Sequence, residues 1–119
     1  MNEPNSNQRG SPATERRPNQ RRRTLLSAVA CHSNGAYTFD CTVRNLSESG
    51  ARVLIASDVP FPSEIYIIVL RDSVAYEAIV VWNSGREIGV RFRQRHCLSD
   101  DVAPGLLFLK RLFLAKLPH

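Results

Sequence analysis

The chain has 119 residues, a formal net charge of +5 and a hydrophobic fraction of 43%, which fits one domain of ordinary size with a real core. Its three cysteines have no Cys-x-x-Cys spacing and its histidines fit no zinc pattern, which argues against a disulfide scaffold and a metal site. The polar amino end and short apolar runs argue against a signal peptide and a membrane span. We therefore expect a cytoplasmic protein with reduced thiols.

Residues 1–24 are rich in Asn, Gln, Ser, Pro and Arg and have almost no large apolar side chains. Their six arginines against Glu3 and Glu15 account for +4 of the net charge, whereas residues 25–119 hold ten basic and nine acidic residues. Such a segment cannot bury enough surface to fold alone, so we expect residues 1–15 to form a disordered arm. An arginine cluster at 16–24 then borders the domain, while the nearly neutral body argues against a broad nucleic-acid-binding surface.

Short segments with β-branched and aromatic residues recur after the arm, separated by polar, Gly or Pro turns. They predict six strands joined by tight turns, and therefore an all-β fold. The expected strands are 25–32, 37–44, 51–56, 65–70, 74–82 and 87–93. We expect them to form a six-stranded antiparallel β-barrel over residues 25–95.

The apolar period then changes from that of a strand to that of a helix, predicted over residues 104–117. Asp100 and Asp101 precede this segment and are interpreted as its start signals. The apolar face of the helix is expected to cover the open side of the barrel or a partner. It is also the candidate surface for docking or dimerisation.

Single residues of the strands have simple structural interpretations. Trp82 is expected to pack in the core or half-buried rather than to serve a ligand, and Gly89 to accommodate a nearby group at the backbone. Cys31 and Cys41 are expected to be buried thiols.

Two polar segments are candidates for binding a phosphate-bearing ligand. The first contains Arg17 and Arg21, four residues apart, just before the first strand. Arginine forks fit phosphate oxygens and stack on flat rings. The second is the turn Asn45-Leu46-Ser47-Glu48-Ser49-Gly50 between two strands. Taken alone, the first segment could be a solvated arm and the second an ordinary turn. Their order along the chain, however, places both at the mouth of the barrel.

These residues resemble the PilZ domain, the bacterial receptor module for cyclic di-GMP. The family's Arg-x-x-x-Arg matches Arg17 to Arg21, and its Asp/Asn-x-Ser-x-x-Gly matches Asn45 to Gly50. A third resemblance is the closing hairpin, Val-Val-Trp-Asn-Ser-Gly at 80–85 followed by Ile-Gly-Val-Arg-Phe at 88–92. The resemblance covers residues 15–93 and implies a stand-alone PilZ-like domain over 16–117.

By this resemblance, Arg17 and Arg21 would grip the phosphates of cyclic di-GMP and stack on guanine, with Arg22 replacing Arg21 if the register slips by one. Asn45 and Ser47 would hydrogen-bond guanine and phosphate edges. Gly50 would allow a close backbone approach and a turn conformation that a Cβ would hinder. The resemblance implies no cofactor, no metal and no catalysis.

The resulting hypothesis is a cyclic di-GMP receptor whose arm orders on the ligand and which signals through an unidentified downstream protein. A homodimer and the number of bound ligands stay open. One alternative is a PilZ scaffold that acts by protein contacts and binds the nucleotide weakly or not at all. Another is nucleic-acid binding by the arm, and an enzyme is the class least supported, since no nucleophile has a base at a suitable spacing.

Overall fold

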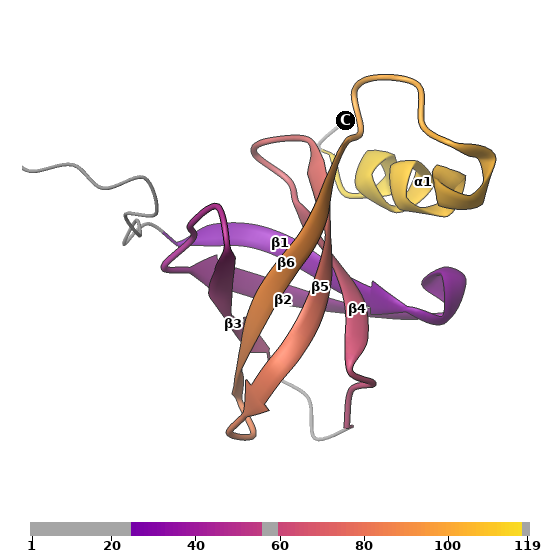
Figure 1. Cartoon of the computed structure of the whole chain (residues 1–119). Helices are drawn as coiled ribbons and strands as arrows, with labels where there is room; N and C mark the ends of the chain where they lie inside the picture. The colour runs from indigo at the N-terminus through magenta and orange to yellow at the C-terminus, as the bar shows by residue number, and fades with distance from the viewer. Residues whose placement is uncertain (1–24, 56–59, 118–119) are drawn as a thin grey trace, which may run out of the picture.

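The structure is a computed structural model that describes residues 25–55 and 60–117. Within these residues six strands precede one α-helix (Figure 1). The elements are β1 (Leu26–His32), β2 (Tyr37–Arg44), β3 (Gly50–Ile55), β4 (Glu64–Val69), β5 (Val74–Asn83), β6 (Glu87–Cys97) and α1 (Leu107–Ala115). The predicted fold class is confirmed. The predicted arm and arginine cluster lie outside the described residues.

The strands form a closed barrel in the order β1-β2-β3-β6-β5-β4, and every pairing is antiparallel. Closure comes from β1, which pairs with β2 on one side and with β4 on the other. Two connections use backbone conformations that suit their residues. The short 3-10 turn Ser33–Gly35 has Asn34 at φ 57°, and the β5–β6 turn has Gly85 at φ 94°. Asn and Gly adopt such left-handed angles at little cost.

The interior of the barrel follows from the alternation of side chains along each strand. On β1, Ala28 and Ala30 belong to the inner cluster, whereas Val29 and Cys31 belong to a second cluster on the opposite face. The inner cluster is built mainly from small and β-branched residues, including Val43, Val53, Ile55, Ile65, Ile67, Val69, Ile88 and Val90. These side chains fill the interior of the six-stranded barrel.

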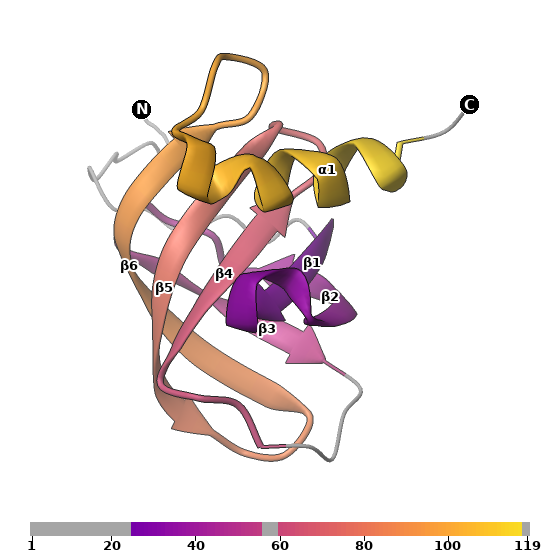
Figure 2. The same ribbon diagram turned by 90° about the vertical axis from the view of Figure 1, so that its right-hand side faces the viewer.

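Helix α1 lies against the outer wall of the barrel, beside β4 and β5 in Figure 2. Its Leu109 and Phe113 are buried in the outer cluster with residues of β1, β4 and β5: Val29, Cys31, Ile68 and Ala75. The prediction that this helix covers the open side of the barrel is therefore wrong. Its main apolar face is therefore used within the chain, while Leu107 and Leu114 stay exposed, and docking or dimerisation through the helix stays a prediction. No helix in the described residues is long and apolar enough to span a membrane.

The C-terminal boundaries also differ from the prediction. β6 continues to Cys97 and stays paired with β5 past the expected end, with a register shift at which Arg93 of β6 is skipped between the pairs Glu77–Gln94 and Ala78–Phe92. The helical segment starts with a 3-10 turn at Pro104, and neither Ala103 nor Leu106 at the two caps makes a side-chain capping bond. The interpretation of Asp100 and Asp101 as start signals is therefore wrong, and the proline sets the first turn instead.

The three cysteines are free thiols. Cys31 lies opposite Thr38 and Cys41 opposite Ala28, so the first two do not face each other across the hairpin. Burial raises the pKa of both Cys31 and Cys41 to about 12. The prediction of buried thiols is confirmed for Cys31, while Cys41 is partly exposed at its position against the inner cluster.

Candidate ligand-binding site

The turn between β2 and β3 is held in shape by its own serine. Asn45 leaves β2 with φ 53°, and the Ser47 amide donates to the Gly50 carbonyl at 2.9 Å. The Ser47 hydroxyl accepts from the amides of Gly50 and Ser49, at 3.2 and 3.3 Å, and is 8% exposed as a residue. A buried hydroxyl with two amide donors fixes the turn much as a capping residue fixes a helix start.

Gly50 is required by a close approach of two strands. A Cβ on this residue would lie 2.2 Å from the carbonyl oxygen of Val90 on β6. The close approach is therefore confirmed. The predicted turn conformation is wrong, because Gly50 is already a β3 residue opposite Arg91 and the left-handed angle belongs to Asn45. The turn is anchored to the same strand by the Phe92 amide, which donates to the Ser49 carbonyl at 2.8 Å.

Asn45 lines a surface pocket beside this turn. The pocket is also lined by Leu25, Arg44, Arg52 and Leu54. Leu25 directly precedes β1, so the start of the first strand lies at the edge of the same pocket as Asn45. Two arginines and an amide in one pocket make a site suited to an anion with hydrogen-bonding edges.

A row of four residues continues from this pocket across the outer face of the barrel. Arg44 on β2 pairs with Arg52 on β3, Arg52 pairs with Gly89 on β6, and Gly89 pairs with Trp82 on β5. The Arg52 guanidinium carbon lies 5.7 Å from the centroid of the Trp82 ring. This is the arrangement of a cation over an aromatic face.

Gly89 makes room for the indole of Trp82. A Cβ on Gly89 would lie 2.1 Å from Trp82 Nε1, so only glycine lets the ring rest against β6. Trp82 nevertheless keeps 41% of its surface exposed. The expectation for Gly89 is therefore confirmed, and Trp82 is half-buried on the outer face of the barrel, which is one of the two forms of packing predicted for it. A large exposed aromatic ring beside arginines is a common feature of nucleotide sites.

Glu87 supplies the negative charge of this surface. Its carboxylate accepts from Arg52 Nη2 at 3.1 Å and lies 4.0 Å from Arg44 Nη1. The side chain of Glu87 is 18% exposed, while those of the two arginines are 41% exposed. The carboxylate is therefore more buried than the two arginines that it faces, and Arg52 Nε is buried with no hydrogen-bond partner among the described residues.

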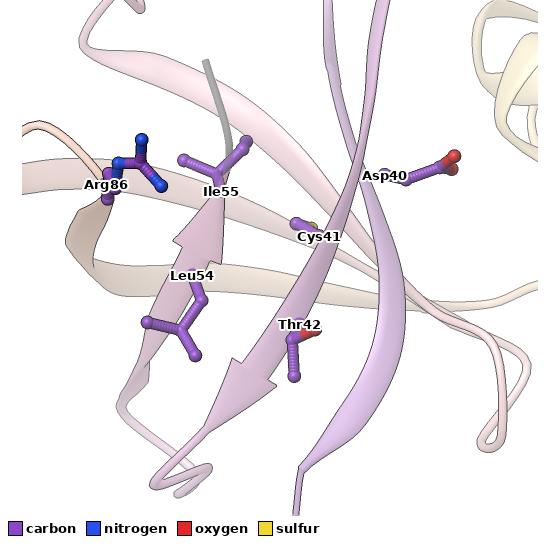
Figure 3. A pocket seen from close by; sticks show the side chains of 6 residues that line it. All are labelled: Asp40, Cys41, Thr42, Leu54, Ile55 and Arg86. Atoms are coloured by element: carbon purple, nitrogen blue, oxygen red, sulfur yellow. The ribbon is translucent and has the colours of Figure 1, made fainter. Parts of the chain in front are cut away.

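A second pocket runs along the same pair of strands (Figure 3). Thr42 and Leu54 face each other across β2 and β3, with Arg86 beyond them, and Leu54 is shared with the pocket at Asn45. Asp40 is directed away from Leu54 in this view and pairs with Lys116 at 2.8 Å. Its carboxylate is therefore engaged by Lys116 of the C-terminal segment.

The structure brings together only part of the predicted site. Asn45, Ser47 and Gly50 lie in one turn, and Arg17, Arg21 and Arg22 lie outside the described residues. The sequence analysis missed the row that ends at Trp82. Its signal was the hairpin register: Arg44 directly precedes the turn, Arg52 follows it by two residues, and the two oppose each other once β2 and β3 pair. In the described residues no three metal-ligating side chains cluster.

Comparison with known proteins agrees with this geometry. The model of the PilZ domain family matches residues 15–100, which contain both polar motifs and all six strands. A search of curated proteins finds no match to the sequence. The family match spans well over half of the chain. The chain therefore belongs to the PilZ domain family, whose members generally are modules that bind cyclic di-GMP.

Proposed function

We propose that this protein is a cyclic di-GMP receptor whose ligand binds between the arginine cluster and the Asn45–Gly50 turn. The observation that carries the proposal is the pocket shared by Leu25 and Asn45. Arg21 is four residues before Leu25, so covalent geometry keeps their Cα atoms within about 14 Å. An arginine side chain adds further reach, which makes the pocket accessible to the cluster.

Each predicted residue has a role in this proposal. Arg17 and Arg21 bind the phosphates, with Arg22 as the alternative to Arg21, because guanidinium forks match phosphate oxygens. Asn45 hydrogen-bonds a guanine edge from the rim of the pocket. Ser47 and Gly50 act mainly by shaping the turn, since the serine hydroxyl is engaged inside it and the glycine is in contact with β6.

The row on the outer face extends this site. Trp82 offers an exposed ring on which a guanine base stacks, and Arg52 above it adds a positive charge. Stacking of a base on an aromatic side chain is worth about 1–3 kcal/mol. The ligand therefore lies across the outer wall and not inside the barrel, whose interior is filled with side chains.

The consequence for signalling follows from where the ligand binds. Closing the arginine cluster over the pocket changes the surface around β2, β3 and β6, and a downstream protein that reads this surface receives the signal. The binding energy is reduced by the cost of ordering the arm. No part of this mechanism requires catalysis or a cofactor.

Calorimetric titration of the full chain with cyclic di-GMP tests the proposal. We expect saturable binding, and we expect Arg17→Ala or Arg21→Ala to abolish it. Arg111→Ala is the matched control, because it removes an equal charge from an exposed position on α1 and should leave the affinity unchanged. Absence of binding by the wild-type chain at high micromolar ligand would contradict the receptor assignment and favour the scaffold alternative.

A further inference from the structure

Arg44 and Arg52 oppose each other directly across β2 and β3. Like charges in directly opposite positions of an antiparallel pair repel and destabilise it. Glu87 on the neighbouring strand β6 lies within reach of both guanidinium groups, at 4.0 Å from Arg44 Nη1 and 3.1 Å from Arg52 Nη2. The carboxylate therefore compensates a pair of charges that the sheet alone would disfavour.

Arg52 is held on two sides. Its Nη2 group donates to Glu87, and its guanidinium plane lies over the Trp82 ring, which itself rests on Gly89. A guanidinium carries five N–H donors; the bond to Glu87 uses one, and the Nε donor is buried without a partner among the described residues. Since Arg52 also lines the pocket at Asn45, the other donors of its two terminal nitrogens remain for an anion that binds there.

Glu87 itself is poorly placed to contact a ligand. Its Oε1 accepts the bond from Arg52, and its Oε2 is buried with no hydrogen-bond partner among the described residues. Its negative charge would also repel a phosphate. The residue can therefore affect binding only through the arginines that it holds.

We propose that Glu87 is a positioning residue of the ligand site, which fixes the Arg52 guanidinium over Trp82 with its free donors toward the anion beside Asn45. This inference rests on the proposed binding of cyclic di-GMP. A flexible arginine would lose side-chain entropy when it binds, whereas one already fixed by a charge-assisted bond loses less. Removal of Glu87 therefore weakens binding although it removes a negative charge from an anion site.

In the opposite role Glu87 would be a gate, which competes with the phosphate of the ligand for Arg52 and so weakens binding. The geometry favours positioning, because Glu87 accepts from one terminal nitrogen and leaves other donors free for the ligand. The two roles predict opposite signs for the same substitution. Glu87→Gln weakens binding if the residue positions Arg52 and tightens it if the residue is a gate.

A double-mutant cycle on the full chain tests the proposal, with cyclic di-GMP affinity measured by calorimetry. We expect Glu87→Gln to weaken binding about fivefold, the size typical of a partly exposed charge pair. Arg52→Met retains an apolar stem against Trp82 and removes the guanidinium. In that background the Glu87→Gln change should have less than about a twofold effect, because the bond to Arg52 is gone and only the longer 4.0 Å approach to Arg44 is left. Glu77→Gln is the control, since Glu77 pairs with Arg93 and His96 away from the Asn45 pocket.

Trp82 provides a second readout, because it is the only tryptophan in the sequence. Without ligand, Glu87→Gln should alter the indole emission in the wild-type background and not in the Arg52→Met background. This measurement does not depend on ligand binding, so it separates a failure of the positioning role from a failure of the receptor assignment. Equal losses of affinity in both backgrounds, a tighter Glu87→Gln variant, or unchanged emission would each overturn the proposal.

Discussion

The outer wall of this barrel has two halves, of which one is covered by α1 and the other is not. On β1, β4 and one end of β5, outward residues such as Val29, Ile68 and Ala75 are apolar and are buried by α1. On β2, β3, β6 and the other end of β5, the outward row holds two partly exposed arginines, a buried glycine and a tryptophan that is 41% exposed. Because side chains fill the interior of this barrel, its outer wall is the surface that remains for function. One half packs under α1, and the other is the surface on which we propose that the ligand binds.

The largest expected effect is on the covered half. Phe113→Ala removes a buried ring from the cluster under α1 and should lower the free energy of unfolding by about 3–5 kcal/mol. The change lies on the covered half, so the affinity for cyclic di-GMP at a temperature where the variant is folded should stay within about twofold of the wild type. Chemical denaturation and calorimetry measure the two quantities.

The neighbouring Leu114→Ala is the control for this prediction, because Leu114 is 51% exposed and its removal leaves no cavity. It should lower the stability by less than about 1 kcal/mol. A Phe113→Ala variant that folds well and yet loses the ligand would show that the two halves are not independent.

An intermediate effect is expected on the open half. Gly89→Ala places a methyl group where the Trp82 indole lies, so the ring must move off β6 and Arg52 loses its support. We expect the affinity for cyclic di-GMP to fall about tenfold, in line with the loss of one stacking contact. The free energy of unfolding should fall by only about 1–2 kcal/mol.

Gly105→Ala is the matched control, since a Cβ there would meet no atom within 4 Å. It should change neither the affinity nor the indole emission. If Gly89→Ala keeps the wild-type affinity while its emission changes, Trp82 moves without consequence and is not part of the ligand site.

The smallest effect is expected where the C-terminal segment meets β2. Asp40→Asn removes the ion pair with Lys116, whose side chains are 78% and 42% exposed. Exposed pairs contribute about 0–1 kcal/mol, so the melting temperature should change little and less still at high salt. Asp101→Asn on the exposed loop is the control. A large loss of stability on Asp40→Asn would mean that this pair fixes the end of α1 onto the barrel.

Local signals predicted most of the barrel. β2 was predicted with its observed bounds because Tyr37–Arg44 alternates between two turns that are readable from Asn and Gly. The end of β6 was missed because a strand can continue past a polar stretch when it accommodates an extra residue, as β6 does at Arg93. The place of α1 was missed because its apolar face fits any apolar surface, and the outer cluster exists only once the strands are paired.

The candidate site, too, could be predicted only where neighbouring residues along the sequence determine it. The turn Asn45–Gly50 was predicted from its residues, but the conformational roles of Asn45 and Gly50 were not, since the contact of Gly50 with Val90 joins β3 to a strand far away in sequence. Trp82 was interpreted as packing because a lone tryptophan in an apolar strand usually packs. Its exposure depends on Gly89 and Arg52, which reach it only through the closed sheet.

The central claim is that the open half of the outer wall is the receptor surface for cyclic di-GMP. Titration of the full chain with this nucleotide, followed by the emission of the sole tryptophan, tests the claim most directly. We predict a saturable change in Trp82 emission that Arg21→Ala abolishes and that cyclic di-AMP does not reproduce. Calorimetric binding of cyclic di-GMP with no change in Trp82 emission would place the ligand elsewhere and contradict the claim.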